Sequence, residues 1–164
     1  MECVGQQNIK KLCNFYVSDL HLSVMLLPYL SKQVNEDVEI TTIFEKLEKE
    51  NIEKVLEKLN LKNKEKIEEI KWFNKKDTED KIANTISKCI NQNKELIIIV
   101  GGTQNFITNN NIKINKYIEN KEVNSRIKII NCFNVEEVGG NMKSIVKNYD
   151  GILNTSGEIK VCDL

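Results

Sequence analysis

Residues Leu96-Ile97-Ile98-Ile99-Val100-Gly101-Gly102 decide the fold of this 164-residue chain. Five consecutive apolar residues are too few for a typical helix, and they would be apolar on both faces of an extended strand. Such runs belong in the middle of a parallel sheet that helices cover on both sides. The two glycines end the strand. The segment therefore predicts a buried central strand that runs parallel to its neighbours.

Strand-like and helix-like segments alternate on either side of this run. The expected strands cover residues 12–17, 38–44 and 126–133, with a short strand or turn at 67–73. Helical spacing of apolar residues separates them over 20–34, 45–60, 77–90 and 135–149, and a polar helix is expected after Gly102. This alternation predicts an α/β fold: one three-layer domain over 1–164, with a mostly parallel sheet and helices on both faces. Residues 151–154 and 158–162 predict a C-terminal β-hairpin turning at Ser156-Gly157.

The first helix of this plan has a specified buried face. The spacing places five apolar residues inward: Leu20, Val24, Leu27, Leu30 and Val34. Ser18-Asp19 are helix-start residues that precede it. Pro28 lies inside the segment and predicts a kink or short break, because proline removes one helical hydrogen bond.

The charge balance limits the classes of partner. The 24 basic and 24 acidic residues cancel, and the pI is near 6.6. A general nucleic-acid binder needs a basic excess to displace counterions from phosphates, so direct nucleic-acid binding is not expected. The longest apolar run is far shorter than the ~18–20 residues that span a bilayer, and the N-terminus lacks the plan of a signal peptide. We therefore expect a cytoplasmic protein without a membrane partner.

Five cysteines occur at wide spacing, and none forms a C-x-x-C pair: Cys3, Cys13, Cys89, Cys132 and Cys162. Only one histidine, His21, could complete a metal set, so no metal site is predicted. Cysteine behaves as a small hydrophobic residue, and buried thiols are the expected role.

Ligands of open α/β sheets bind outside the carboxyl ends of the strands. Four loops qualify: 17–19, 74–78, 101–106 and 133–135. The most informative is Gly101 to Phe106, where two glycines allow close approach of backbone N–H groups to a ligand. A phosphate-binding loop would need G-x-x-x-x-G-K-[ST], which is absent, as is the dinucleotide pattern G-x-G-x-x-G. No cofactor is therefore predicted.

Eight residues at these strand ends form the predicted ligand-binding site: Tyr16, Ser18, Asp19, Thr103, Gln104, Phe106, Phe133 and Asn134. They should converge because the carboxyl ends of parallel strands share one edge of the sheet. Aromatic walls supply contact area, and hydroxyl and amide groups fix the orientation of a small molecule. The alternative is that the aromatic residues close the core and the polar residues cap helices.

No catalytic set is predicted. His21 falls in the first turn of a helix, where a surface or capping role is the simplest interpretation. Nothing fixes a nucleophile beside it. Carboxylate pairs such as Glu136-Glu137 are more simply solvated faces and helix starts.

Three segments resemble the MEDS domain, a small sensory module named for methanogens and methylotrophs. The first is Cys13-Asn14-Phe15-Tyr16-Val17-Ser18-Asp19 with the helix through Leu26-Leu27-Pro28-Tyr29-Leu30; the second is Ile129-Ile130-Asn131-Cys132-Phe133-Asn134; the third runs from Ser144 through Tyr149 to Gly157. The resemblance implies a RecA-like α/β fold without nucleotide hydrolysis, and a role in sensing small molecules within signalling or transcriptional regulators.

The chain departs from the family at several positions. The family usually has histidine where Lys11 stands, tyrosine where Asn134 stands, and histidine near Tyr149. A terminal Asn-Pro-aromatic motif is also missing. The ligand or its mode of binding is therefore expected to differ here.

The leading hypothesis is a non-enzymatic sensory or regulatory domain that binds a small, largely apolar molecule at the strand ends. Family members are often fused to a DNA-binding or kinase domain, and the length leaves no room for either, so a separate signalling or transcription-regulatory protein is the expected partner. A homodimer is compatible with this hypothesis. Two alternatives remain: an enzyme of small-molecule or nucleotide metabolism using Asp19, His21 and the turn at Gly101, or a protein-interaction module using residues 45–62.

Overall fold

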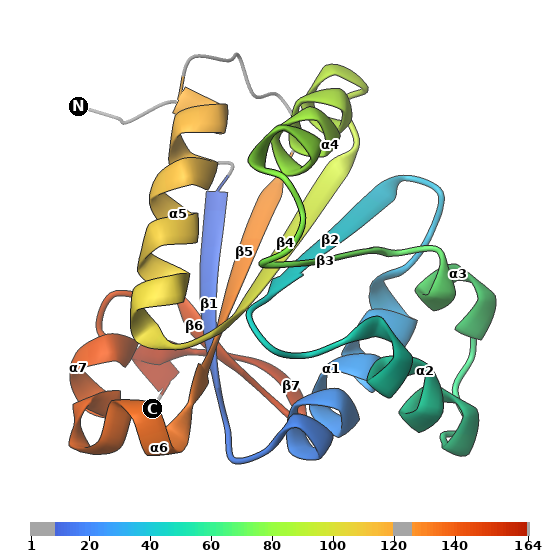
Figure 1. Ribbon diagram of the computed structural model, residues 1–164. Coiled ribbons are helices and arrows are strands. Elements are labelled where there is room, and N and C mark those ends of the chain that lie inside the picture. The colour runs from blue at the N-terminus through green and yellow to red at the C-terminus, as the bar shows by residue number, and fades with distance from the viewer. Residues whose placement is uncertain (1–8, 120–125, 164) are drawn as a thin grey trace.

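The computed structural model describes residues 9–119 and 126–163, and Cys3 lies outside these ranges. Its centre is one seven-stranded sheet in the order β3-β2-β4-β5-β1-β6-β7 (Figure 1). The strands are β1 Ile9–Tyr16, β2 Val38–Phe44, β3 Lys71–Asn74, β4 Glu95–Gly102, β5 Ile127–Asn134, β6 Gly151–Asn154 and β7 Gly157–Lys160. All neighbouring pairs are parallel except β6 and β7. The α/β class, the mostly parallel sheet and the C-terminal hairpin are confirmed.

Helices cover both faces of the sheet. They are α1 Asp19–Gln33, α2 Lys49–Lys58, α3 Lys64–Glu68, α4 Glu79–Asn91, α5 Gln104–Glu119, α6 Val135–Val138 and α7 Met142–Val146, with 3₁₀ turns η2 Gly139–Asn141 and η3 Val161–Asp163. One core lies between the sheet and α1, α2 and α3, and the other lies beneath α4, α5, α6 and α7. Within the described residues, every helix is too short or too polar to cross a bilayer.

Strand β4 has the predicted position. It pairs in parallel with β2 on one side and β5 on the other. All five residues from Leu96 to Val100 are at most 1% exposed. Successive side chains of a strand point to opposite faces, so Ile97 and Ile99 enter one core while Ile98 and Val100 enter the other.

Helix α1 is rotated relative to the expected face. Leu20 is 63% exposed and Val24 is 40% exposed, so their predicted burial is wrong. Leu27 and Leu30 are buried as predicted, and they share the buried side with Leu22, Met25 and Leu26. Residues 20–30 are apolar at nearly every position, so the pattern does not specify which side faces the core. The helix continues through Pro28 without a break.

The last predicted helix, over 135–149, is divided into three short pieces. Gly139 has φ +52°, a conformation that most side chains avoid, and it ends α6. A 3₁₀ turn then leads into α7. The apolar spacing persists across the break, because Val138, Ile145 and Tyr149 all pack in the same core.

Polar groups near the amino ends of β1 and β5 form a closed network on the α1 side. We call Lys10, Tyr29, Lys128 and Glu158 the amino-end cluster. The Glu158 carboxylate accepts hydrogen bonds from Lys10 Nζ at 2.7 Å, Lys128 Nζ at 2.6 Å and the Tyr29 hydroxyl at 2.9 Å. Burial acts to raise the pKa of Glu158, but these hydrogen bonds outweigh it and lower the pKa to about 2. The cluster links β7 to helix α1 and to strands β1 and β5.

Candidate functional site

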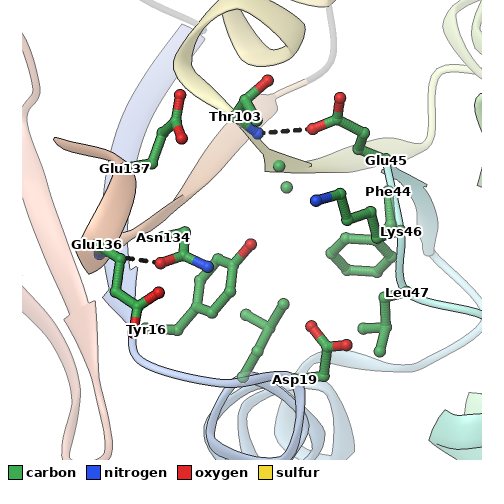
Figure 2. Close-up of a pocket in the computed structure, with 13 residues that line it drawn as sticks. Tyr16, Asp19, Phe44, Glu45, Lys46, Leu47, Thr103, Asn134, Glu136 and Glu137 are labelled. Carbon is green, nitrogen blue, oxygen red and sulfur yellow. Dashed lines mark hydrogen bonds between the residues drawn. The ribbon is translucent and has the colours of Figure 1, made fainter.

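A cavity of about 390 Å³ opens at the carboxyl edge of the sheet, on the α1 side (Figure 2). This size falls in the range of small-molecule sites, roughly 300–1,000 Å³. Its walls come from the ends of β1, β2, β4 and β5 and from the residues that follow them. The lining residues are Tyr16, Asp19, Leu22, Phe44, Glu45, Lys46, Leu47, Gly101, Gly102, Thr103, Asn134, Glu136 and Glu137. We call it the carboxyl-edge cavity.

Two glycines bring the β2–α2 loop against the end of β4. A Cβ on Gly101 would lie 2.7 Å from the Phe44 ring, and one on Gly102 would lie 2.7 Å from Glu45 Cβ. The Glu45 N–H donates to the Gly101 carbonyl at 2.9 Å, and the Thr103 N–H donates to Glu45 Oε1 at 2.8 Å. The two glycines therefore allow this loop to pack closely against β4. The Thr103 N–H is already hydrogen-bonded to the Glu45 carboxylate.

Tyr16 forms part of the cavity wall with an unpaired hydroxyl. The residue is only 6% exposed, and its hydroxyl points into the cavity in Figure 2. None of the described residues forms a hydrogen bond with that hydroxyl. Burial, followed by the nearby Cys132, Asp19 and Glu45, raises the pKa of Tyr16 well above its ordinary value. The group is therefore a neutral hydroxyl at any physiological pH.

Charges around the cavity are unequal. Four carboxylates line it and one ammonium group, Lys46, faces them: the acids are Asp19, Glu45, Glu136 and Glu137. Figure 2 shows the Lys46 amine directed into the cavity. No carboxylate of the described residues lies within 4 Å of that amine. The carboxylates are also spread apart, since no three acidic, histidine or cysteine side chains of the described chain are grouped to hold a metal ion.

The structure brings four of the eight predicted site residues together. Tyr16, Asp19, Thr103 and Asn134 line the carboxyl-edge cavity. Thr103 and Asn134 also act as helix caps: Thr103 Oγ1 accepts from the Phe106 N–H, and Asn134 Oδ1 accepts from the Glu136 N–H. Capping and lining are therefore not exclusive at these positions.

The other four predicted residues lie elsewhere. Ser18 is exposed and caps α1 by accepting from the His21 N–H at 3.1 Å. Gln104 and Phe133 line a groove of about 260 Å³ beside α5 and α7, and Phe106 lines a third groove between α4 and α5. For Phe133 the physical reason is strand alternation, because it points to the face opposite its neighbour Asn134.

Sequence reasoning missed the β2–α2 loop, which contributes Phe44, Glu45, Lys46 and Leu47. The predicted helix over 45–60 begins four residues too early, because α2 begins at Lys49. That error hid a fifth strand-end loop. Glu136 and Glu137 were interpreted as a solvated face, and they are exposed while also lining the cavity.

The groove beside α5 and α7 contains a paired amide network instead of unpaired groups. The side chains of Asn111 and Asn131 exchange two hydrogen bonds, at 2.9 and 3.0 Å. Asn131 also donates to the Tyr149 hydroxyl at 2.7 Å. Because these buried amides satisfy one another, the network supports packing of α5 on β5.

The contacts of His21 and the burial of three cysteines indicate roles in the fold. His21 Nδ1 accepts a hydrogen bond from the Val17 N–H at 3.0 Å, so the ring braces the start of α1. Cys13, Cys89 and Cys132 are buried. Burial raises the pKa of the Cys13 thiol to about 12 and that of Cys89 to about 11, so neither is a thiolate near neutral pH.

No protein-family model and no curated protein is matched by this sequence. Among solved structures, the chain is similar to an ATPase from the type III secretion system of pathogenic bacteria, with a TM-score of 0.52 and 14% identity. The match covers 87% of this chain and 50% of that chain, so this chain spans half the length of its neighbour. At this identity the likeness concerns the fold alone.

Proposed function

We propose that the chain is a non-catalytic sensory or regulatory domain that binds a small molecule in the carboxyl-edge cavity. The observation that carries the proposal is the convergence of Tyr16, Asp19, Thr103 and Asn134 on one cavity of about 390 Å³. The lining combines four buried apolar or aromatic residues with a larger number of charged, hydroxyl and amide groups, and such polar groups fix the orientation of a bound molecule. The fold likeness to an ATPase agrees with the expected RecA-like fold.

Local geometry argues against nucleotide hydrolysis at this edge. Only Val17 and Ser18 connect β1 to α1, which is too short for a Gly-rich phosphate-binding loop. The Thr103 N–H, which precedes α5 and could contact an anion, is already bonded to Glu45. A triphosphate would also meet four carboxylates and a single lysine.

The β2–α2 loop offers a route from the cavity to a partner protein. Glu45, Lys46 and Leu47 line the cavity, and α2 begins at Lys49. Helix α2 buries only Ile52 and Leu56 and exposes its charged side. A ligand that favours one position of the loop would therefore change the surface that α2 presents to a separate signalling protein.

Ligand-observed and protein-observed NMR test this function. A library of small molecules is screened against the ¹⁵N-labelled chain, and amide shifts are mapped onto the structure. We expect hits that shift Tyr16, Glu45 and Thr103 together. ATP with Mg²⁺ should neither shift these amides at micromolar concentration nor release phosphate. Hits confined to other surfaces, or Thr103-dependent ATP hydrolysis, would contradict the proposal.

A further inference from the structure

We propose that the carboxyl-edge cavity selects a small organic cation: an ammonium or guanidinium group attached to a compact apolar body. This inference rests on the proposed function and names the chemical class of the ligand. It follows from the Tyr16 hydroxyl, the charge of the lining and the position of Lys46.

The Tyr16 hydroxyl is a hydrogen-bonding group of the cavity wall that pairs with no described residue. The residue is more than nine-tenths buried, and its hydroxyl points into the cavity, where it forms no hydrogen bond with a described residue but remains accessible to solvent. Its oxygen has lone pairs that can accept an N–H from a ligand. Because the group stays neutral, it adds no charge to the site. Because solvent reaches the hydroxyl through the cavity, a ligand N–H can replace that solvent contact with a hydrogen bond to the Tyr16 oxygen.

The lining charge favours a cation over a neutral or anionic ligand. Asp19, Glu45, Glu136 and Glu137 contribute four negative charges, and Lys46 contributes one positive charge. Asp19, Glu136 and Glu137 are exposed, so water screens each attraction strongly, but all four carboxylates act in the same direction and favour a cation. The carboxylates are too dispersed to enclose a metal ion, whereas an organic cation of several ångströms can span them.

Aromatic and aliphatic side chains fit the body of such a ligand. Tyr16, Phe44, Leu22 and Leu47 are all buried and line the cavity. Aromatic faces attract ammonium and guanidinium groups, and the aliphatic side chains exclude water from an apolar body. A wholly apolar ligand would instead leave the surrounding carboxylates partly desolvated without compensation.

Lys46 places a positive charge at the cavity, although the residue as a whole is exposed. Its amine is directed inward and pairs with no carboxylate within 4 Å in the described chain. A ligand cation must therefore share the site with the lysine or displace it. This gives a signed prediction, because removing Lys46 should strengthen the binding of a cation and weaken the binding of an anion.

The experiment compares three probes of one shape and different charge. Phenethylammonium, 2-phenylethanol and 3-phenylpropionate are titrated into the ¹⁵N-labelled chain, with the Tyr16 and Thr103 amides as reporters. We expect the cation to bind at least about fivefold more tightly than the neutral probe, and the anion to bind least.

Variants of the lining then test each contribution. Asp19→Asn should weaken phenethylammonium binding about threefold to tenfold, and Tyr16→Phe should weaken it about threefold, because each removes one contact. Lys46→Met should strengthen it about threefold. Matched controls outside the cavity, Glu50→Gln and Lys54→Met on α2, should leave the affinity unchanged. Urea unfolding of every variant shows that it is folded.

The outcomes separate this inference from the proposed function. If the neutral or anionic probe binds most tightly at the same amides, or if Lys46→Met weakens the cation, the cationic class is wrong while a small-molecule site stands. If neither the three probes nor the wider library shifts these amides, the site itself fails and the proposed function fails with it.

Discussion

The amino-end cluster and the carboxyl-edge cavity contain the same kinds of groups on the same side of the sheet, yet they are organised in opposite ways. At the amino end, the Glu158 carboxylate holds two lysines and the Tyr29 hydroxyl within 2.9 Å. At the carboxyl edge, the Tyr16 hydroxyl and the Lys46 amine point into open space. The difference shows how one chain uses tyrosine, lysine and carboxylate for stability at one end and keeps them available at the other.

The largest expected effect comes from opening the amino-end cluster. Glu158→Ala leaves the Lys128 amine, whose side chain is only 14% exposed, without its 2.6 Å partner. We expect a loss of about 2–3 kcal/mol in the free energy of unfolding, because a half-buried charge loses its compensation. Urea denaturation measures it. Glu136→Ala at the cavity should cost less than about 0.5 kcal/mol, since that side chain is exposed. Equal losses of unfolding free energy for the two variants would contradict the proposed difference between the amino-end cluster and the carboxyl-edge cavity.

Acid should open the same cluster without mutation. The pKa of Glu158 is about 2 in the folded chain and near its ordinary 4.5 when unfolded. A folded pKa below the unfolded value contributes stability above about pH 4.5, and that contribution is lost as the pH falls toward 2. Solvent screening at this partly exposed side chain limits it to about 1–2 kcal/mol. Unfolding free energies of the wild type and Glu158→Gln, measured from pH 5 to 2, should therefore converge; parallel curves would contradict the assignment.

The hydrogen bond between Glu45 and the Thr103 N–H at the cavity rim should have a smaller effect on stability. Glu45→Ala removes the acceptor of the Thr103 N–H, a 2.8 Å hydrogen bond. We expect a cost of about 1 kcal/mol in the free energy of unfolding. Glu45→Gln keeps an acceptor and should cost less than about half of that. A Gln variant as unstable as Ala would show that the charge, and not the hydrogen bond, holds the loop.

The smallest expected effect separates the two tyrosines. Tyr29→Phe removes a hydroxyl that donates to Glu158 and accepts from Lys128, and it should cost about 1 kcal/mol. Tyr16→Phe removes an unpaired hydroxyl and should change the free energy of unfolding by less than about 0.3 kcal/mol. Thermal and urea unfolding both report it. A large loss at Tyr16 would mean that its hydroxyl has a structural partner in solution.

The sequence predicted best where a local pattern has only one favourable solution. The run from Leu96 to Val100 is apolar at every position, so only a doubly covered strand buries it. The phase of α1 escaped prediction because Leu20 and Val24 are as apolar as the residues that became buried. The break at Gly139 escaped because the apolar spacing continues across it.

The candidate site was predictable in location but not in composition. Strand ends at one edge of the sheet indicated Tyr16 and Thr103 correctly as cavity residues. Phe133 was misplaced because the final residues of a strand alternate in direction, and the sequence does not fix the last residue within one position. Glu158 was invisible to any local argument, since its partner Lys10 lies 148 residues away.

The strand order also bears on how the chain folds. Strand β1, the first described, pairs with β5 and β6, so Ile9 lies beside Ile127 and Leu12 beside Gly151. During synthesis β1 therefore has neither neighbour until the last third of the chain has emerged. Strands β2, β3 and β4 can meet earlier, as a smaller unit with α2, α3 and α4. Long-range parallel pairing slows folding, so we expect the pairing of β1 with β5 and β6 to be the late, rate-limiting event. The partly folded chain in which β1 is still exposed is expected to be the form most prone to aggregate.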